Sequence, residues 1–177
     1  MTSAVVIAGS LVTITVTRVA STVVAQLRAL RSASGSSKLV VGLDVALLQL
    51  CSGTQCLVVQ LHLLDYIPEE LAGFLADPAV VFVGVGITSD VLKLREDYGW
   101  GVRNAVELAP LAAKKHVPFA GLGLVDLLRS VLGISIEKPA SVACSDWTAE
   151  HLSHDQIVYA ATDAYVSYLI GEKLLGN

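Results

Sequence analysis

The chain has few charged and few aromatic residues, and it has no long uninterrupted hydrophobic run. Of its 177 residues, 16% are charged and 6% are aromatic, whereas 54% are hydrophobic. The densest apolar stretch, residues 79–87, is far shorter than the roughly 18 residues of a membrane-spanning helix. No basic residue precedes the apolar stretch 4–12, which makes it a poor signal peptide. We therefore expect an intracellular protein of the cytoplasm or nucleus, with no membrane partner, that forms a homo-oligomer to cover its surplus apolar surface.

The chain also lacks a surplus of basic residues. Twelve Lys and Arg face sixteen Asp and Glu, which gives a formal net charge of −4 and a pI of about 5.5. Proteins that bind nucleic acid through its phosphate backbone are typically basic. An acidic site that binds metal ions can still neutralise phosphates locally. The charge balance therefore argues against tight backbone binding and still allows a nuclease.

Cysteine is scarce, with three residues at positions 51, 56 and 144. An odd number without a secretory signal favours reduced thiols. Cys51 and Cys56 flank a turn at 52–55 and could face each other across a hairpin. A second pair of ligands, which a zinc site needs, is missing from the sequence around them. We expect structural cysteines.

The order of apolar patterns predicts strands first, then strands alternating with helices, then helices. Expected strands are 5–7 and 11–17, which form a hairpin or one bent edge strand. They are followed by 39–50 and 56–64, paired antiparallel, and by 80–87 and 104–108. Expected helices are 20–32, a short one from Pro68, 91–98 capped by Thr88–Asp90, 111–116, 123–132 and 148–175, with a loop at 134–146. This order predicts one α/β domain, 1–177, with a mixed sheet flanked by helices on both faces.

The last helix carries the most informative pattern. Tyr159 and Asp163 are four residues apart, so they share one helix face one turn apart. Small residues on the opposite side, Ala160, Ala161 and Ala164, allow close packing. A phenol and a carboxylate placed this way could serve a metal and its water. Taken alone, the pattern is better explained by a buried Tyr beside a solvated Asp.

Three segments carry a further pattern. They are Val40-Val-Gly-Leu-Asp44, then Val83-Gly-Val-Gly-Ile-Thr-Ser-Asp90, then Leu152-Ser-His-Asp-Gln156 followed by Tyr-Ala-Ala-Thr-Asp-Ala-Tyr. In this order they resemble the first, second and third motifs of the DEDD superfamily of exonucleases, in its tyrosine-bearing branch with ribonuclease D and the Werner-syndrome-type exonucleases. Between the second and third motifs, the family's order continues in Gly121-Leu122, Leu127-Leu128, Leu132-Gly133, Lys138 and Ser145-Asp-Trp147. The resemblance covers roughly residues 38–175.

The resemblance implies a ribonuclease H-like fold and 3′–5′ exonuclease activity on single-stranded RNA or DNA ends. It implies two Mg²⁺ or Mn²⁺ ions held by Asp44, Asp90 and Asp163, with Tyr159 holding the attacking water. Considered without the family resemblance, the three acids support these roles to different degrees. A carboxylate within so apolar a strand as that of Asp44 is costly unless it is paired or bound to metal. Asp90 could be an ordinary helix-capping acid, and Asp163 could simply be solvated.

One departure from the family concerns the first motif. The family reads Asp-x-Glu, whereas Ala46 follows Asp44 at the third position. A methyl group binds no cation, so a second ion would be loosely held; Glu107 or a carboxylate of a neighbouring subunit could compensate. The alternative function is therefore a catalytically inactive exonuclease fold that acts as a nucleic-acid-binding or assembly subunit.

A dinucleotide-binding site is a weaker alternative. Gly84-Val-Gly86-Ile-Thr-Ser89 follows a predicted strand and opens a predicted helix, and Glu107 lies about twenty residues on. The third small position is a serine, however, and Glu107 does not clearly end a second strand of a βαβ unit. We therefore prefer the exonuclease interpretation.

Overall fold

The computed structural model describes residues 1–33, 38–45, 47–118 and 123–176. Its strands are β1 (Thr2–Ile7), β2 (Ser10–Thr17), β3 (Leu39–Val45), β4 (Leu48–Ser52), β5 (Gln55–Val59), β6 (Val80–Gly84) and β7 (Ala105–Glu107). They form a mixed sheet in the spatial order β1-β2-β5-β4-β3-β6-β7. The pairs β1–β2, β3–β4 and β4–β5 are antiparallel, whereas β2–β5, β3–β6 and β6–β7 are parallel.

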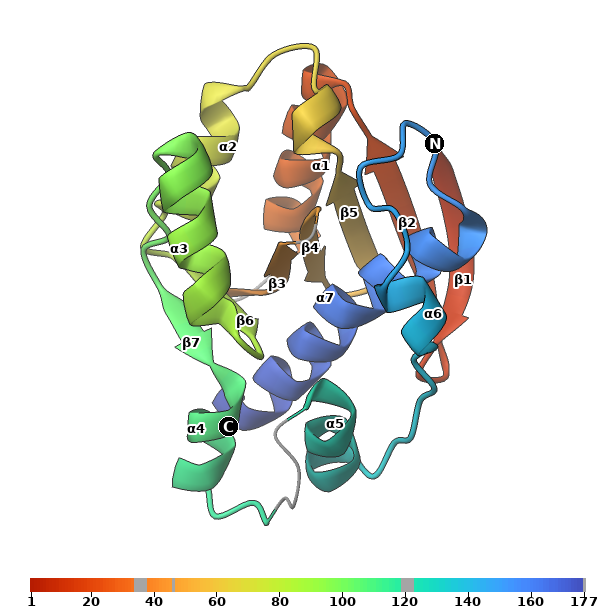
Figure 1. The fold of residues 1–177 in the computed structure, drawn as a ribbon. Helices are drawn as coiled ribbons and strands as arrows, with labels where there is room; N and C mark the ends of the chain where they lie inside the picture. The colour runs from red at the N-terminus through yellow and green to blue at the C-terminus, as the bar shows by residue number, and fades with distance from the viewer. Residues whose placement is uncertain (34–37, 46, 119–122, 177) are drawn as a thin grey trace.

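Helices cover both faces of this sheet, as the sequence predicts. On one face, the core joins the strands to α1 (Ala20–Ala33), α2 (Glu69–Leu75) and α3 (Ile87–Tyr98). On the other face, it joins them to α4 (Leu108–Lys114), α5 (Leu124–Leu132) and α7 (His154–Leu175). The short α6 (Ala140–Ala143) precedes α7, which runs diagonally across the sheet (Figure 1). None of the described helices is long and apolar enough to cross a membrane.

The N-terminal hairpin and the helices α1 and α2 lie close to their predicted positions. The hairpin β1–β2 turns at Ala8 and Gly9, both with positive φ. The amphipathic helix α1 begins at Ala20 and ends one residue beyond the predicted end. Pro68 caps α2, whose first turn carries two glutamates, a favourable charge at a helix N-terminus.

The single strand predicted for 39–50 is wrong. The structure has two antiparallel strands there, β3 and β4, with Asp44 opposite Gln49. The run is almost uniformly apolar and contains no turn residues near the reversal, so periodicity could not reveal it. The next predicted strand, 56–64, ends at Val59 and is followed by a 3₁₀ turn, η1 (Leu61–Leu63).

Two predicted helix starts also need correction. Gly86 adopts a left-handed conformation, and α3 begins directly after it, at Ile87. The strand β6 ends at Gly84, and Thr88–Asp90 belong to the first helical turn instead of forming a cap.

The last helix begins at His154 instead of Thr148, because Ser153 caps it. The Ser153 hydroxyl accepts a hydrogen bond from Gln156 N–H, and the Gln156 side chain accepts one from Ser153 N–H. The predicted strand at 104–108 is confirmed as β7.

The central helix α7 approaches the sheet so closely that only glycine fits beneath it. A Cβ atom on Gly42 of β3 would lie 1.7 Å from the carbonyl oxygen of Ala164. Small residues on this side of α7, predicted to allow close packing, are buried: Ala160, Ala161 and Ala164 are at most 1% exposed. The close contact fixes α7 directly over β3.

Cys51 and Cys56 form a disulfide, so the prediction of reduced thiols is wrong for this pair. The two residues are directly opposite each other in the β4–β5 hairpin, with Cα atoms 4.2 Å apart. An odd count of cysteines does not exclude one pair, and the turn at 52–55 brings these two together. Cys144 is free and exposed.

Candidate functional site

The three predicted acids lie on three different elements that meet near the end of β3. Asp44 is the penultimate residue of β3. Asp90 lies in the first turn of α3, which follows β6, the parallel neighbour of β3. Because the carboxyl ends of parallel strands lie at the same edge of a sheet, α3 begins beside Asp44. Asp163 lies in α7, next to the residue that contacts Gly42.

The pKa values of Asp90 and Asp163 both respond to the charge of Asp44. Burial, followed by the charges of Asp44 and Glu107, raises the pKa of Asp90 from 3.8 to about 7, against the opposing charge of Lys93. Burial is also the main reason why the pKa of Asp163 rises to about 6; Lys138 lowers that pKa, and Asp44 raises it. Asp44 therefore acts on both other carboxyl groups. The three form one partly buried region of negative charge, which favours a cation.

Lys138 is one cation that this region attracts. It comes from the segment between α5 and α6, and its ammonium group forms an ion pair with Asp163. Burial by itself would lower the pKa of Lys138, but the charge of Asp163 and hydrogen bonds to Asp163 and Tyr159 raise it above its usual value. The lysine is therefore charged, and it ties its segment to α7.

Tyr159 lies between a cation and an aromatic ring. The Lys138 Nζ atom is 4.3 Å from the centre of the Tyr159 ring, within the range of a cation–π contact. On another side, the ring of Trp147 lies 5.9 Å away, centre to centre, and is tilted by 52°. Tyr159 is one helical turn before Asp163, as predicted, so Lys138 contacts both residues.

The segment that carries Trp147 is held from the helix side by Gln156. The buried side-chain amide of Gln156 donates to the Ser145 hydroxyl at 3.0 Å and to the Asp146 carbonyl at 2.8 Å. The oxygen of the same amide accepts from Ser153 N–H. Gln156 thus connects the start of α7 to residues 145 and 146, which directly precede Trp147.

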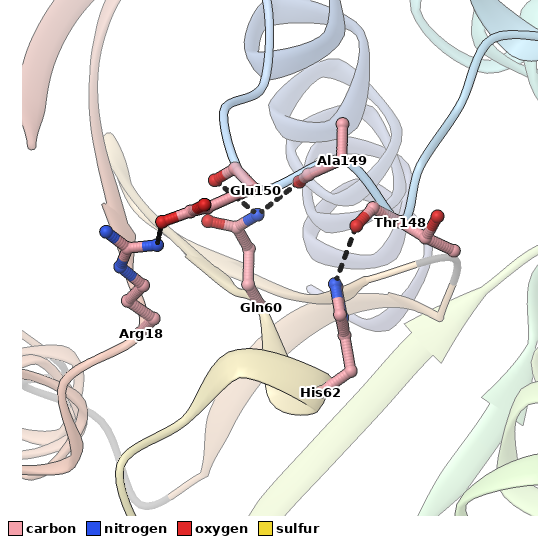
Figure 2. A network of polar contacts seen from close by, with 6 residues as sticks. All are labelled: Arg18, Gln60, His62, Thr148, Ala149 and Glu150. Carbon is pink, nitrogen blue, oxygen red and sulfur yellow. Dashed lines mark hydrogen bonds and ion pairs between the residues drawn. The ribbon is translucent and has the colours of Figure 1, made fainter.

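The same segment is held from the sheet side by Gln60 (Figure 2). This residue is 5% exposed, and its Nε2 donates to the carbonyl oxygens of Ala149 and Glu150 at 3.0 and 3.4 Å. His62 Nε2 lies 3.2 Å from the Thr148 carbonyl, and Arg18 forms a 2.7 Å ion pair with Glu150. Residues 145–150 are therefore anchored on both sides.

A cavity of about 200 Å³ opens between this segment and α3. Its walls combine apolar, aromatic and charged side chains, including Val45, Leu47, His62, Lys93, Tyr98 and Trp147. Val45 directly follows Asp44, and Lys93 acts on Asp90. The cavity therefore adjoins the acidic region, and its size and mixed lining suit part of a small planar ligand.

The structure describes Glu107, suggested to compensate for the missing glutamate, but not Ala46, which replaces that glutamate. Ala46 lies outside the described residues. Glu107, suggested as a compensating carboxylate, acts electrostatically on Asp90, and its Oε1 accepts from Gly86 N–H at 2.7 Å. It is thus near the acidic region and is engaged with the start of α3.

The chemistry of the acidic region suits a hard divalent ion, because every candidate ligand is an oxygen. Within the described ranges, no three His, Cys, Asp or Glu side chains are positioned to hold one ion in this conformation, in which Lys138 pairs with Asp163. One further side-chain oxygen belongs to the residue that pairs with Asp44 in the sheet. Gln49, opposite Asp44, is 2% exposed, and its Oε1 has no hydrogen-bond partner in the described chain. That oxygen fits a cation ligand.

A family model described as 3′–5′ exonuclease matches residues 34–176. The chain belongs to this exonuclease family. The match includes Asp44, Asp90, Tyr159 and Asp163, together with Lys138 and Trp147. This confirms the resemblance drawn from the three motifs.

Curated relatives of this exonuclease-family chain are longer proteins. It is 39% identical over 139 residues to mouse "Exonuclease 3′-5′ domain-containing protein 2", matching 75% of this chain and 21% of that protein. It is 36% identical over 134 residues to mouse "Bifunctional 3′-5′ exonuclease/ATP-dependent helicase WRN", matching 75% of this chain and 10% of that protein. The chain thus spans about a fifth or less of the length of these two relatives.

Solved structures confirm the ribonuclease H-like fold. The EXD2 exonuclease domain is 31% identical, covers 92% of this chain and 88% of its own, and gives a TM-score of 0.55. The same domain has been soaked in Mn and GMP and in Mg and dGMP. Escherichia coli RNase D, at 19% identity, covers 91% of this chain and 44% of its own with a TM-score of 0.77, which supports the fold alone.

The contributions of Lys138, Trp147 and Gln60 illustrate what sequence reasoning missed. Lys138 and Trp147 were recognised as part of the family's order, but nothing in their spacing predicts that both contact Tyr159. Gln60 follows a strand and carries no periodic or motif signal. Its role depends on contacts with residues about 90 positions away, which only the tertiary fold brings near.

Proposed function

We propose that this chain is a single exonuclease-like domain, 1–177, that removes nucleotides from single-stranded 3′ ends of RNA or DNA with Mg²⁺ or Mn²⁺. The observation that carries the proposal is geometric: Asp44 near the end of β3, Asp90 in the first turn of α3 and Asp163 in α7, the helix packed over β3, come from three separate elements. Family membership and the metal-soaked EXD2 domain support the same interpretation. Asp44, Asp90 and Asp163 would hold the metal, and Tyr159 completes the proposed site.

The chain's residues divide the work in this proposal. When bound, divalent ions activate water and stabilise the charge that develops on phosphate. The carboxylates of Asp44, Asp90 and Asp163 would hold the ions, and they would release their protons as the ions bind. Lys138 must move from Asp163 or share it with an ion. Tyr159 would hold the attacking water through its hydroxyl, and its ring contacts Trp147 and Lys138.

The cavity beside Trp147 would hold the terminal nucleotide. It adjoins the acidic region, and base stacking on an aromatic side chain suits a single-stranded end without strong sequence preference. EXD2 domains soaked in GMP and dGMP are consistent with a nucleotide site in this fold. Lys93 and Asp97 also line the cavity, so one positive and one negative side chain lie beside the expected nucleotide.

A trimming assay tests the proposal. We expect a 5′-labelled single-stranded oligonucleotide to be shortened in single-nucleotide steps with Mn²⁺ or Mg²⁺, and we expect EDTA to stop the reaction. A 3′-inverted terminal nucleotide should block it, whereas a modified 5′ end should not. Parallel RNA and DNA substrates identify the preferred sugar. If neither substrate is shortened with either metal, the nuclease proposal is wrong, and the alternative below is favoured.

A catalytically inactive, nucleic-acid-binding or assembly subunit is the second candidate. Two observations favour it specifically: Ala46 replaces the glutamate of the first motif, and Lys138 already pairs with Asp163. Binding of the same oligonucleotide, measured by fluorescence anisotropy without any shortening, would support this candidate.

We also propose that the protein is a homo-oligomer located in the cytoplasm or nucleus. The outer hairpin supports self-association, because Val6 and Leu11 are opposite each other in β1–β2 and are 67% and 65% exposed. Exposed apolar side chains at a sheet edge are typical of association surfaces. Light scattering at micromolar concentration should give a mass above 18.6 kDa; the mass of a single chain would contradict the proposed oligomer.

A further inference from the structure

Gln49 of β4 places a buried amide beside Asp44. The two residues are directly opposite each other in the antiparallel β3–β4 pair. Opposed residues in such a pair point to the same face of the sheet, with Cβ atoms about 4.5–5.5 Å apart. Gln49 is 2% exposed, and within the described ranges its Oε1 has no hydrogen-bond donor. A buried amide oxygen without a donor destabilises the folded state.

The face to which Gln49 points is the face covered by α7. Cys51, two residues later in β4, lies on the same face as Gln49 because side chains alternate along a strand. Its sulfur atom is 3.8 Å from the Ala161 carbonyl of α7. Gly42, two residues before Asp44, contacts α7 at Ala164. Asp44 and Gln49 therefore both face the helix that carries Asp163.

The chemistry of this location favours a cation over another polar partner. The carboxylate opposite Gln49, that of Asp44, is an acceptor only when it is ionised, and it then cannot donate a hydrogen bond to the Gln49 oxygen. A divalent ion would satisfy the amide oxygen and the carboxylates at once. Amide oxygens of Asn and Gln are ordinary ligands for hard divalent ions. The sequence supplies no oxygen from the side chain of residue 46, where the family has a glutamate.

We infer that the Oε1 atom of Gln49 is a ligand of the divalent ion, together with Asp44, and supplies from β4 an oxygen that the methyl side chain of Ala46 lacks. The inference rests on the proposed function for the presence of an ion, and it assigns a ligand that the three motifs do not contain. An amide in place of a carboxylate makes the site less negative by one charge. The ion should therefore bind more weakly than in a site with a fourth carboxylate.

Calorimetric titration with Mn²⁺ and thermal unfolding of the metal-free protein together test this ligand. Gln49→Met keeps the approximate side-chain length and removes the amide, that is, the oxygen and the NH₂ group. We expect it to weaken Mn²⁺ binding at least about 10-fold, while the midpoint of metal-free unfolding stays equal or rises, because an oxygen without a donor is removed. Gln49→Glu should tighten Mn²⁺ binding and lower the metal-free midpoint. Gln55→Met, at the start of the neighbouring β5, is the matched control and should change neither quantity.

The outcomes separate this inference from the proposed function. If wild type and Gln49→Met bind Mn²⁺ equally, Gln49 is not a ligand, and the three-carboxylate proposal is unaffected. A large fall in the metal-free midpoint of Gln49→Met would show that the oxygen has a structural partner, and this too would overturn the inference. Absence of Mn²⁺ binding to wild type would overturn both proposals.

Discussion

Replacing Asp163 with asparagine is expected to lower the rate of 3′-end trimming at least about 100-fold. The substitution keeps the shape of the side chain and removes one of three carboxylates proposed to hold the metal. Loss of about 3 kcal/mol of transition-state stabilisation corresponds to that factor. Single-turnover trimming of a labelled oligonucleotide measures the effect. Asp155→Asn, in the exposed first turn of the same helix, is the matched control and should leave the rate unchanged.

The same variant should change how stability depends on pH. The pKa of Asp163 is raised from 3.8 to about 6, so the folded state binds its proton more tightly than the unfolded state. The stabilising contribution is fully present below pH 3.8 and is lost as pH rises toward 6. Urea unfolding of the metal-free protein should therefore show a smaller loss of stability over this range in Asp163→Asn than in wild type. An unchanged pH profile, or unchanged trimming, would contradict the role of Asp163.

Gly42→Ala is expected to cost about 3 kcal/mol or more of unfolding free energy and to abolish trimming as well. The added methyl group would overlap the Ala164 carbonyl of α7, and a helix backbone cannot move aside as a flexible side chain can. Displacement of α7 would also carry Asp163 away from Asp44. Urea denaturation and the trimming assay measure the two effects.

Gly73→Ala provides the control for this substitution. Gly73 lies within α2, and a Cβ atom there would meet nothing within 4 Å. Because alanine is a better helix former than glycine, this variant should gain about 0.5–1 kcal/mol. If Gly42→Ala is as stable as wild type, the close contact between β3 and α7 does not position the site.

The sequence predicts the overall architecture better than it predicts where individual strands and helices begin and end. The order of apolar segments correctly predicts a mixed sheet with helices on both faces, because amphipathic and buried segments are set by composition and period. The reversal between β3 and β4 is missed, since the run around Leu43 and Leu48 stays apolar on both sides of it. The start of α3 is missed because Gly86 adopts a positive φ, which the sequence permits but does not require.

The candidate site was predicted through motifs, and its surroundings were not. Asp44, Asp90, Tyr159 and Asp163 were identified from the family's pattern and from a helical spacing of four residues. The pairing of Lys138 with Asp163 depends on the path of the segment before α6. The position of Gln49 opposite Asp44 depends on a strand reversal that periodicity could not locate. These contacts follow from topology and register, which one sequence does not encode in any local pattern.

Calorimetric titration of wild type and Asp163→Asn with Mn²⁺ near pH 7.5 tests the central claim most directly. Most Asp90 and Asp163 groups are ionised at that pH, given pKa values of about 7 and about 6. The account predicts at least one Mn²⁺ bound per wild-type chain and at least about 10-fold weaker binding to Asp163→Asn. Absence of binding to wild type, or equal binding to both proteins, would contradict a metal site built from these carboxylates.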